Sequence, residues 1–337
     1  MNTIDRNTNK KPIFALTMGD PAGIGPEITL KTLDSLQTSE YGVVVIGDKS
    51  VLEQACRFVK VRSVLRVIKK PGEFTKGSIN ILDMHQIGTG DFIIGKVQSQ
   101  CGRAAYSYIM KSIDLAMGFE IAGVITNPIS KEALKTAGID FPGHTEIFAS
   151  RTGVSDYSMM FLLDNVAVAH VTTHCSLRKA IDSVTRARVL STSRLLYKTV
   201  KRLGVEKPRI AVGGLNPHAG EHGLFGDEEI KDIEPAVRDA RNEGLNVTGP
   251  YPPDTVFMRA FKGEFDGVVS MVHDHGFVAL KSRDFEHGVN ITIGLPIIRT
   301  SVGHGTAFDI AGTGKASEES LRTAIEAAWR LWKKRME

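Results

Sequence analysis

Short apolar runs alternate with longer amphipathic stretches along the chain, and this alternation predicts an α/β protein. Five runs are rich in branched aliphatic residues, as expected for strands that a parallel sheet buries on both faces. These candidate strands are residues 13–18, 43–47, 122–126, 209–213 and 267–272, and the clearest candidate helices are 100–117, 189–203 and 318–332. Strands that alternate with helices in this way predict a mostly parallel sheet.

One pair of candidate strands is arranged differently. Residues 157–163 and 166–171 are both apolar, and only Asp164 and Asn165 separate them. Two strand-like runs joined by two such residues predict an antiparallel hairpin.

Composition and charge narrow the class of protein. The chain has 337 residues and a formal net charge of +4, without a long basic tract, so we expect no nucleic-acid partner. No run approaches the roughly 18 apolar residues of a membrane span, so we expect no membrane partner either. Three widely separated cysteines fit a reducing cytoplasm. The polar residues 1–11 are expected to be a disordered lead-in to a cytoplasmic protein.

Three histidines each follow a candidate strand by a few residues. They are His174, His218 and His273. Because a parallel sheet gathers the carboxyl ends of its strands along one edge, such side chains can meet although they are distant in sequence. Three imidazoles with an open position form a catalytic divalent-metal site, most often for zinc. Three unrelated loop histidines are the alternative, and His222 and His275 are further candidate ligands.

Several polar side chains could hold an anionic substrate. Lys281 and Asn290 lie in the last third of the chain with Arg299, which stands in an apolar setting and should therefore need an anionic partner. An internal salt bridge would satisfy Arg299 equally well. Thr145, after His144, is predicted to cap a helix that begins at Glu146, and the start of this helix could face an anion.

Two glycine-rich segments suit close approach to a ligand. Residues 303–314 hold four glycines among hydroxyl and carboxylate groups, as a nucleotide-binding loop does, although an ordinary turn has the same composition. Residues 19–27 form a strand–loop–helix junction in which Pro26 suits the first turn of the helix. Their spacing is not that of the dinucleotide-binding glycine motif, and Asp20 at the end of the strand is the more informative residue.

The motifs resemble those of 4-hydroxythreonine-4-phosphate dehydrogenase, the PdxA family of vitamin B6 synthesis. The resemblance spans nearly the whole chain, and its motifs come in the same order. They are Met18-Gly-Asp-Pro-Ala-Gly-Ile-Gly-Pro-Glu27, Gly143-His-Thr-Glu146, Thr172-Thr-His174, Leu215-Asn-Pro-His-Ala-Gly220, His273-Asp274 and Gly288-Val-Asn-Ile-Thr292. The segment 304–312 is also similar to the cofactor loop of isocitrate and isopropylmalate dehydrogenases, which bind NAD without a Rossmann motif.

The resemblance implies a fold and a set of roles. The fold would be two α/β domains with mostly parallel sheets and a cleft between them, residues 1–130 plus 295–337 and residues 131–294, like isocitrate and isopropylmalate dehydrogenases. The protein would be a homodimer whose metal ligands come from both chains. The implied residues are His174, His218 and His273 for a divalent metal (Zn, Mg, Co or Mn), His144, Thr145, Lys281, Asn290 and Arg299 for substrate, and Gly305, Thr306, Asp309 and Gly312 for NAD or NADP.

Three departures from the family pattern bear on the substrate. His275 stands where the family commonly has Gln, Gly303 where it commonly has Asp, and Cys175-Ser176 where the biosynthetic enzymes often have Leu-Pro. Members of the family oxidise 4-phospho-D-threonate or 4-phospho-D-erythronate, and others oxidise aromatic dihydrodiols. The identity of the phosphorylated hydroxy acid therefore stays open.

The reaction expected from this resemblance is oxidation of a 3-hydroxy acid, followed by decarboxylation. The metal would lower the pKa of the hydroxyl, and Lys281 or Asp274 would relay protons. A metal-dependent hydrolase or aldolase that works without NAD is the main alternative. A protein that only senses a phosphorylated ligand is a further one.

Overall fold

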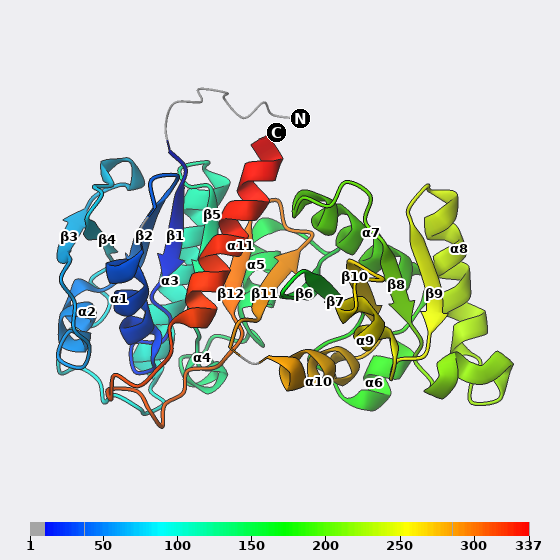
Figure 1. Cartoon of the computed structure of the whole chain (residues 1–337). Helices are drawn as coiled ribbons and strands as arrows, with labels where there is room; N and C mark the ends of the chain where they lie inside the picture. The colour runs from blue at the N-terminus through cyan, green and yellow to red at the C-terminus, as the bar shows by residue number, and fades with distance from the viewer. Residues whose placement is uncertain (1–10, 37, 285, 337) are drawn as a thin grey trace. The chain divides into compact units, whose positions relative to one another are not determined.

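The computed structural model describes residues 11–336 except 37 and 285, and they form two compact units (Figure 1). The first unit contains residues up to 140 and 305–318, and the second contains 141–304 and the chain from 319 onward. The predicted N-terminal lead-in, apart from Lys11, lies outside the described residues. In the described part of the chain, no helix is long and apolar enough to cross a membrane.

The first unit is a parallel sheet with helices on both faces. Its strands follow the order β3-β4-β2-β1-β5, and every pair in it is parallel. Because crossover connections are right-handed, α1 and α2 cover one face and α3 the other. The strands are β1 (Ile13–Thr17), β2 (Gly42–Gly47), β3 (Val64–Ile68), β4 (Ser78–Asp83) and β5 (Gly123–Thr126), and the helices are α1 (Gly25–Ser35), α2 (Lys49–Ala55), η1 (Pro71–Glu73), α3 (Ser99–Met117) and α4 (Lys131–Thr136).

The second unit has a mixed sheet of order β12-β11-β6-β7-β10-β8-β9. Strands β7, β10, β8 and β9 run parallel to one another, whereas β6, β11 and β12 add antiparallel pairs. Its strands are β6 (Ser158–Leu163), β7 (Val166–His170), β8 (Ile210–Gly213), β9 (Val247–Tyr251), β10 (Gly267–Ser270), β11 (Val289–Ile293) and β12 (Arg299–Val302).

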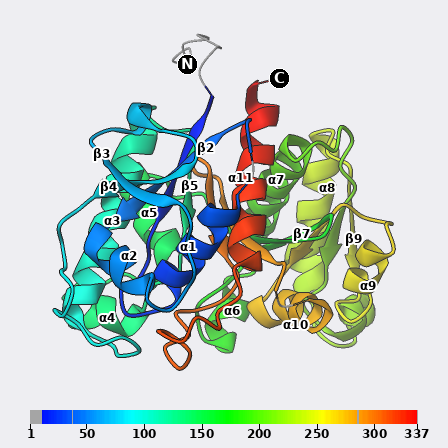
Figure 2. The ribbon, with the colours of Figure 1, turned by 60° about the vertical axis from the view of Figure 1, so that its left-hand side comes forward.

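The helices of the second unit pack on both sides of this sheet, and α7 and α8 lie side by side in Figure 1 and Figure 2. They are α5 (His144–Thr152), α6 (Leu177–Asp182), α7 (Arg186–Arg202), η2 (Pro217–Gly223), η3 (Glu229–Ile233), α8 (Glu234–Asn242), α9 (Val256–Phe261), α10 (His273–Arg283) and α11 (Glu319–Met336). Helix α11 packs on β12, β11 and α7. It therefore groups with the second unit, whereas the family resemblance implied that it belongs to the first domain.

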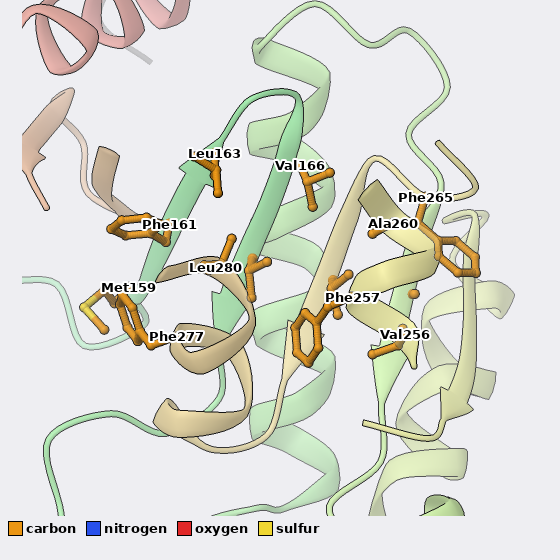
Figure 3. Close-up of a cluster of buried hydrophobic side chains, with 13 residues drawn as sticks. Met159, Phe161, Leu163, Val166, Val256, Phe257, Ala260, Phe265, Phe277 and Leu280 are labelled. Atoms are coloured by element: carbon orange, nitrogen blue, oxygen red, sulfur yellow. The ribbon is translucent and has the colours of Figure 1, made fainter. Parts of the chain in front are cut away.

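A buried cluster fixes α9 and α10 on the face of β6, β7 and β10. Figure 3 shows its largest members, and Phe277 and Leu280 extend from α10 toward β6 and β7. Phe161 and Phe277 meet edge to face at 5.2 Å between ring centroids. Since α10 begins with His273, this packing also fixes one of the predicted site residues.

Candidate active site

The buried guanidinium of Arg299 is the centre of a group of polar side chains in the second unit, called here the Arg299 cluster. Arg299 opens β12 and is 2% exposed. Its Nη1 donates to Thr292 Oγ1 at 3.0 Å, and Thr292 Oγ1 lies 3.3 Å from Thr145 Oγ1. The guanidinium carbon is 5.7 Å from the centroid of the Phe148 ring. Strands β11 and β12 thus join the start of α5 around one cation.

The charges around Arg299 favour an anionic ligand. Burial lowers the pKa of Arg299 to about 9, and the charge of Glu146 only partly opposes this. Burial also lowers the pKa of His144 well below its usual value, and the nearby Arg299 charge adds to the shift. His144 is therefore neutral at physiological pH. A phosphate or carboxylate would stabilise the charged guanidinium that burial penalises.

Some buried polar atoms near Arg299 have no hydrogen-bond partner among the described residues. They include His144 Nε2, Glu146 Oε2 and Asn290 Oδ1. Asn290 lies on β11 opposite Ser301 of β12. Since buried polar groups are nearly always satisfied in folded proteins, these atoms indicate a place for a polar ligand.

The predicted cap of α5 is wrong in one respect. The helix begins at His144 instead of Glu146, its N-cap is Gly143, and no side chain caps it. Thr145 therefore lies in the first turn, where its hydroxyl reaches Thr292 instead of its own backbone.

Two of the three predicted metal-binding histidines lie together. The rings of His174 and His273 are 5.8 Å apart between centroids, and both residues line a cavity of about 380 Å³. His273 Nδ1 is 2.7 Å from Asp274 Oδ1. An ionised carboxylate can only accept, so Nδ1 carries the hydrogen and the Nε2 lone pair is available to a cation.

A further histidine, which the sequence did not single out, lies under this pair. His170 is fully buried at the end of β7 and stacks on Phe277 at 4.7 Å, with His273 6.2 Å away. Burial lowers the pKa of His170 to about 3, so this ring is neutral. A neutral ring adds no positive charge beneath the His174–His273 pair.

Helix α10 carries His273, Phe277 and Lys281 on one face, since they are four residues apart. The Phe277 ring lies 4.4 Å from the His273 ring and 5.1 Å from Lys281 Nζ. Lys281 is exposed in the last turn. The structure therefore brings the two predicted residues to the same side of one helix.

His218 lies apart from the other two histidines. It is exposed, and its ring faces Phe225 at 6.0 Å between centroids. Among the residues that the structure describes, no group of three His, Cys, Asp or Glu side chains is placed to hold a metal ion. Within a single chain, the structure thus brings together two of the three histidines that were predicted to bind one metal ion, His174 and His273.

The His218 loop, defined here as residues 214–226, has an unusual backbone. His218, Ala219, Gly220, Glu221 and His222 all have φ between 43° and 79°. Four of these five are not glycine, and such residues rarely enter the left-handed region. Strained backbone of this kind clusters at functional sites.

In the first unit, the predicted cofactor loop is fastened to α1. Glu27, which is 2% exposed, accepts the backbone N–H groups of Gly312 and Gly314. Lys31 Nζ donates to the carbonyls of Gly314 and Ala316 at 2.8 and 2.6 Å.

The start of the same loop rests on the junction that precedes α1. The N–H of Ile24 donates to Thr306 O at 3.0 Å, and a Cβ on Gly23 would lie 3.0 Å from that oxygen. Gly305 and Asp309, in contrast, are exposed. Gly23 therefore allows the backbone to pack closely against the predicted cofactor loop.

Asp20 ends the same strand–loop junction and is 1% exposed. Burial raises its pKa to about 6, although the N–H groups of Ala22 and Ser130 act in the opposite direction. Its Oδ2 has no hydrogen-bond partner in the described chain.

Comparison with known proteins decides the family. The model of the family described as "Pyridoxal phosphate biosynthetic protein PdxA" matches residues 39–328. The chain belongs to the PdxA family. It is 47% identical to a D-threonate 4-phosphate dehydrogenase of Pectobacterium atrosepticum, over 95% of this chain and 99% of the relative.

Solved structures agree with this assignment. A 4-hydroxythreonine-4-phosphate dehydrogenase of Klebsiella pneumoniae superposes with a TM-score of 0.86 and 45% identity, covering 96% of this chain and 100% of that one. A 4-hydroxythreonine-4-phosphate dehydrogenase of Burkholderia phymatum superposes with a TM-score of 0.81 and 42% identity, covering 96% of this chain and 99% of that one.

The structure gives the surroundings of all three departures from the usual PdxA motifs. A Cβ on Gly303 would lie 3.0 Å from Gly288 O and 3.2 Å from the Phe161 ring, so this chain has little room there for the aspartate common in the PdxA family. His275 is half-buried, and burial lowers its pKa although Asp274 opposes the shift. Cys175 is exposed beside His174.

Proposed function

We propose that this chain oxidises a 4-phosphorylated 3-hydroxy acid with NAD and a divalent metal, and that D-threonate 4-phosphate is its substrate. The main support for this proposal is the buried guanidinium of Arg299 beside the neutral imidazole of His144. In addition, a relative that is 47% identical to this chain is named for that substrate. In this reaction the C3 alcohol would become a ketone by losing a hydride, which a bound nicotinamide would accept, and its hydroxyl proton, which a protein base would take. The resulting β-keto acid then loses its carboxylate as carbon dioxide.

Arg299, His144, Thr145 and Asn290 bind the substrate in this proposal. A guanidinium presents paired donors that match phosphate or carboxylate oxygens. Thr292 and Phe148 hold Arg299 in place, so little side-chain freedom is lost when the anion binds. The unpartnered oxygens of Glu146 and Asn290 suit hydrogen-bond donors on the sugar acid.

The donor set supports a metal site in which His174 and His273 are two ligands and His218 of a second copy is the third. A divalent ion supplies Lewis acidity, which lowers the pKa of the substrate hydroxyl and stabilises the enolate left by decarboxylation. Asp274 orients His273 through the 2.7 Å hydrogen bond. Lys281, on the same face of α10, is the residue we assign to proton transfer.

We assign nicotinamide cofactor binding to the loop that contains Gly305, Thr306, Asp309 and Gly312. When bound, NAD or NADP accepts the hydride. Glu27 and Lys31 hold the end of this loop on α1, so the loop would already be in a fixed arrangement when the cofactor binds.

The exposed apolar side chains support a homodimer. Leu224 and Phe225 follow His218 and are 72% and 47% exposed, and Leu177 follows His174 and is 67% exposed. Val278, on α10 after His273, is 68% exposed. Large apolar side chains next to all three histidine segments are expected where a second copy covers them.

A substrate panel tests the proposal. Purified protein would be mixed with NAD or NADP, a divalent metal and D-threonate 4-phosphate, D-erythronate 4-phosphate or 4-hydroxythreonine-4-phosphate. We expect growth of the NADH absorbance band and release of one carbon dioxide per hydride, fastest with D-threonate 4-phosphate, and loss of both after chelation.

The second candidate substrate is 4-hydroxythreonine-4-phosphate, for which the Klebsiella and Burkholderia structures are named. It carries an amino group at C2 where D-threonate 4-phosphate carries a hydroxyl, and Glu146 could accept from either. Faster turnover of the amino acid would reassign the substrate. Turnover without NADH would favour the hydrolase or aldolase alternative, and binding without turnover would favour a sensor.

A further inference from the structure

A buried carboxylate organises the backbone that presents His218. Glu229 is 1% exposed and stands at the start of η3, the π-helical turn that leads into α8. Its Oε1 accepts the N–H groups of Leu215 and Asn216 at 2.7 and 2.8 Å. Its Oε2 accepts Asn216 Nδ2 at 2.9 Å. All three donors therefore come from the strand-to-loop junction directly before His218.

The packing of two glycines shows how closely the loop folds around this carboxylate. A Cβ on Gly214 would lie 3.1 Å from Glu229 Oε1, and one on Gly220 would lie 2.7 Å from Oε2. Gly214 precedes the donors and Gly220 lies inside the left-handed turn. The carboxylate thus occupies the concave side of the His218 loop.

The left-handed turn needs such support. His218, Ala219, Glu221 and His222 all have positive φ, a conformation that costs an L-residue steric energy and that the chain would leave if it were unrestrained. The π-helical turn is a second irregularity, and such turns are frequent at functional sites. Both irregularities meet at Glu229.

We propose that Glu229 is a positioning residue for the metal-binding reaction: it holds the His218 loop in the left-handed conformation that presents the His218 imidazole to the ion. This inference rests on the proposed function, because it takes His218 to be a ligand. Glu229 itself touches neither metal nor substrate. It acts through the backbone of residues 215–220, as outer hydrogen-bond partners do in other metal sites.

The test compares Glu229→Gln with Glu228→Gln in the full-length protein. Glu228 also contacts Asn216, since its Oε2 accepts Asn216 Nδ2 at 2.7 Å. Among the described residues, no backbone N–H of the His218 loop donates to Glu228, so Glu228→Gln is the matched control. A glutamine at position 229 keeps the shape of the side chain but turns one acceptor into a donor that faces Asn216 Nδ2.

Two readouts are independent of turnover. In Co²⁺ titrations followed by visible absorption, Glu229→Gln should bind about 10- to 100-fold more weakly than wild type, and Glu228→Gln within about two-fold of it. Amide hydrogen exchange of the metal-free protein should be faster at residues 215–223 in Glu229→Gln. Binding of inorganic phosphate, which reports on the polar side chains around Arg299, should not change.

The benchmark His218→Ala separates this inference from the proposed function. If His218→Ala weakens Co²⁺ binding and Glu229→Gln does not, the positioning role is overturned while the ligand role stands. If His218→Ala binds Co²⁺ as wild type does, the ligand role fails, and the inference fails with it.

A second variant keeps the test decisive if Glu229→Gln does not fold. Loss of exchange protection in β8 and β10 would reveal that failure. Gly220→Ala would then displace the carboxylate without removing it, since the added Cβ would meet Oε2. Weaker Co²⁺ binding by Gly220→Ala is expected, and wild-type affinity would overturn the proposal.

Discussion

At the scale of single residues, Arg299 is a charged side chain that is almost completely buried. Its pKa is lowered to about 9 because burial penalises the guanidinium. In the proposed function, the anion that arrives with the substrate would stabilise this buried charge. The hydrogen bond that Arg299 donates to Thr292 and the Phe148 ring fix the plane of the guanidinium before binding.

Arg299→Lys should weaken substrate binding more than it slows the chemical step. A lysine cannot present two parallel donors, and losing one charge-assisted hydrogen bond of about 1.5–3 kcal/mol corresponds to a KM roughly 10- to 100-fold higher. Steady-state kinetics with the phosphorylated acid and calorimetry with inorganic phosphate measure the effect. Arg283→Lys, at an exposed arginine that stacks on Phe261, is the control. Equal KM values for the two variants would contradict the assignment.

Asp20 predicts a pH dependence of stability. Burial raises its pKa to about 6 in the folded chain, against the usual aspartate value of 3.8. Between these values the unfolded chain has lost the proton that the folded chain keeps, so stability falls as the pH rises from about 4 to about 6 and is then level. A shift of about two units corresponds to roughly 3 kcal/mol.

Asp20→Asn lacks this titration. We therefore compare the unfolding free energies of the variant and of wild type at two pH values. The difference, variant minus wild type, should be up to about 3 kcal/mol larger at about pH 7.5 than at about pH 4. Urea unfolding at both pH values measures it, with Asp182→Asn at an exposed site as the control. Parallel pH profiles for wild type and Asp20→Asn would show that Asp20 does not have the raised pKa.

Sequence reasoning could propose residues whose chemistry is visible from their type and neighbours, but it could not propose those that act through contacts. Arg299 attracts attention in any apolar run, and His144 and Thr145 stand in a recognisable motif. Thr292 and Glu229 look ordinary in the sequence. Only the fold shows that Thr292 contacts Arg299 and that Glu229 accepts hydrogen bonds from the backbone of the His218 loop. These roles come from contacts across many residues, which no local pattern contains.

At the scale of elements, the apolar strands were predictable and the polar ones were not. Strands β1, β2, β5, β8 and β10 lie where valine-rich or isoleucine-rich runs predicted them, and the β6–β7 hairpin is confirmed. Strand β12 reads Arg-Thr-Ser-Val, and β9 contains Gly249 and Pro250. Neither has a strand-like composition, because β12 carries site residues and β9 lies at the edge of the sheet.

Helix α1 makes a testable contribution as the support of the cofactor loop. Lys31→Met removes the hydrogen bonds to the carbonyls of Gly314 and Ala316. Losing hydrogen bonds from a charged group costs about 1.5–3 kcal/mol each, part of which should appear as weaker NAD binding, by roughly 10-fold. The KM for the phosphorylated acid should not change, because the residues proposed to bind it, around Arg299, belong to the second unit.

The control for α1 is Lys49→Met. Lys49 pairs with Glu53 on the surface of α2, in the same unit, at 3.0 Å. Calorimetry with NAD compares both variants with wild type. If Lys31→Met binds NAD as Lys49→Met does, helix α1 does not position the loop for the cofactor.

At the scale of the whole molecule, the separation of His218 from His174 and His273 has a direct consequence. If an ion takes His174 and His273 from one copy and His218 from another, each site needs intact residues on both chains. His218→Ala and His273→Ala homodimers would then both be inactive, because each damages every site. A mixed dimer of the two would contain one doubly damaged site and one intact site.

Mixing the inactive variants should therefore restore activity. Equal amounts, unfolded and refolded together, give mixed dimers in about half of the population, each with one of two sites intact, so about a quarter of wild-type activity is expected. Mixing His174→Ala with His273→Ala is the matched control. Those ligands come from the same copy, so a mixed dimer would have both sites damaged and would stay inactive. Recovery in the control as well, or in neither mixture, would contradict a site in which His218 crosses to the other chain.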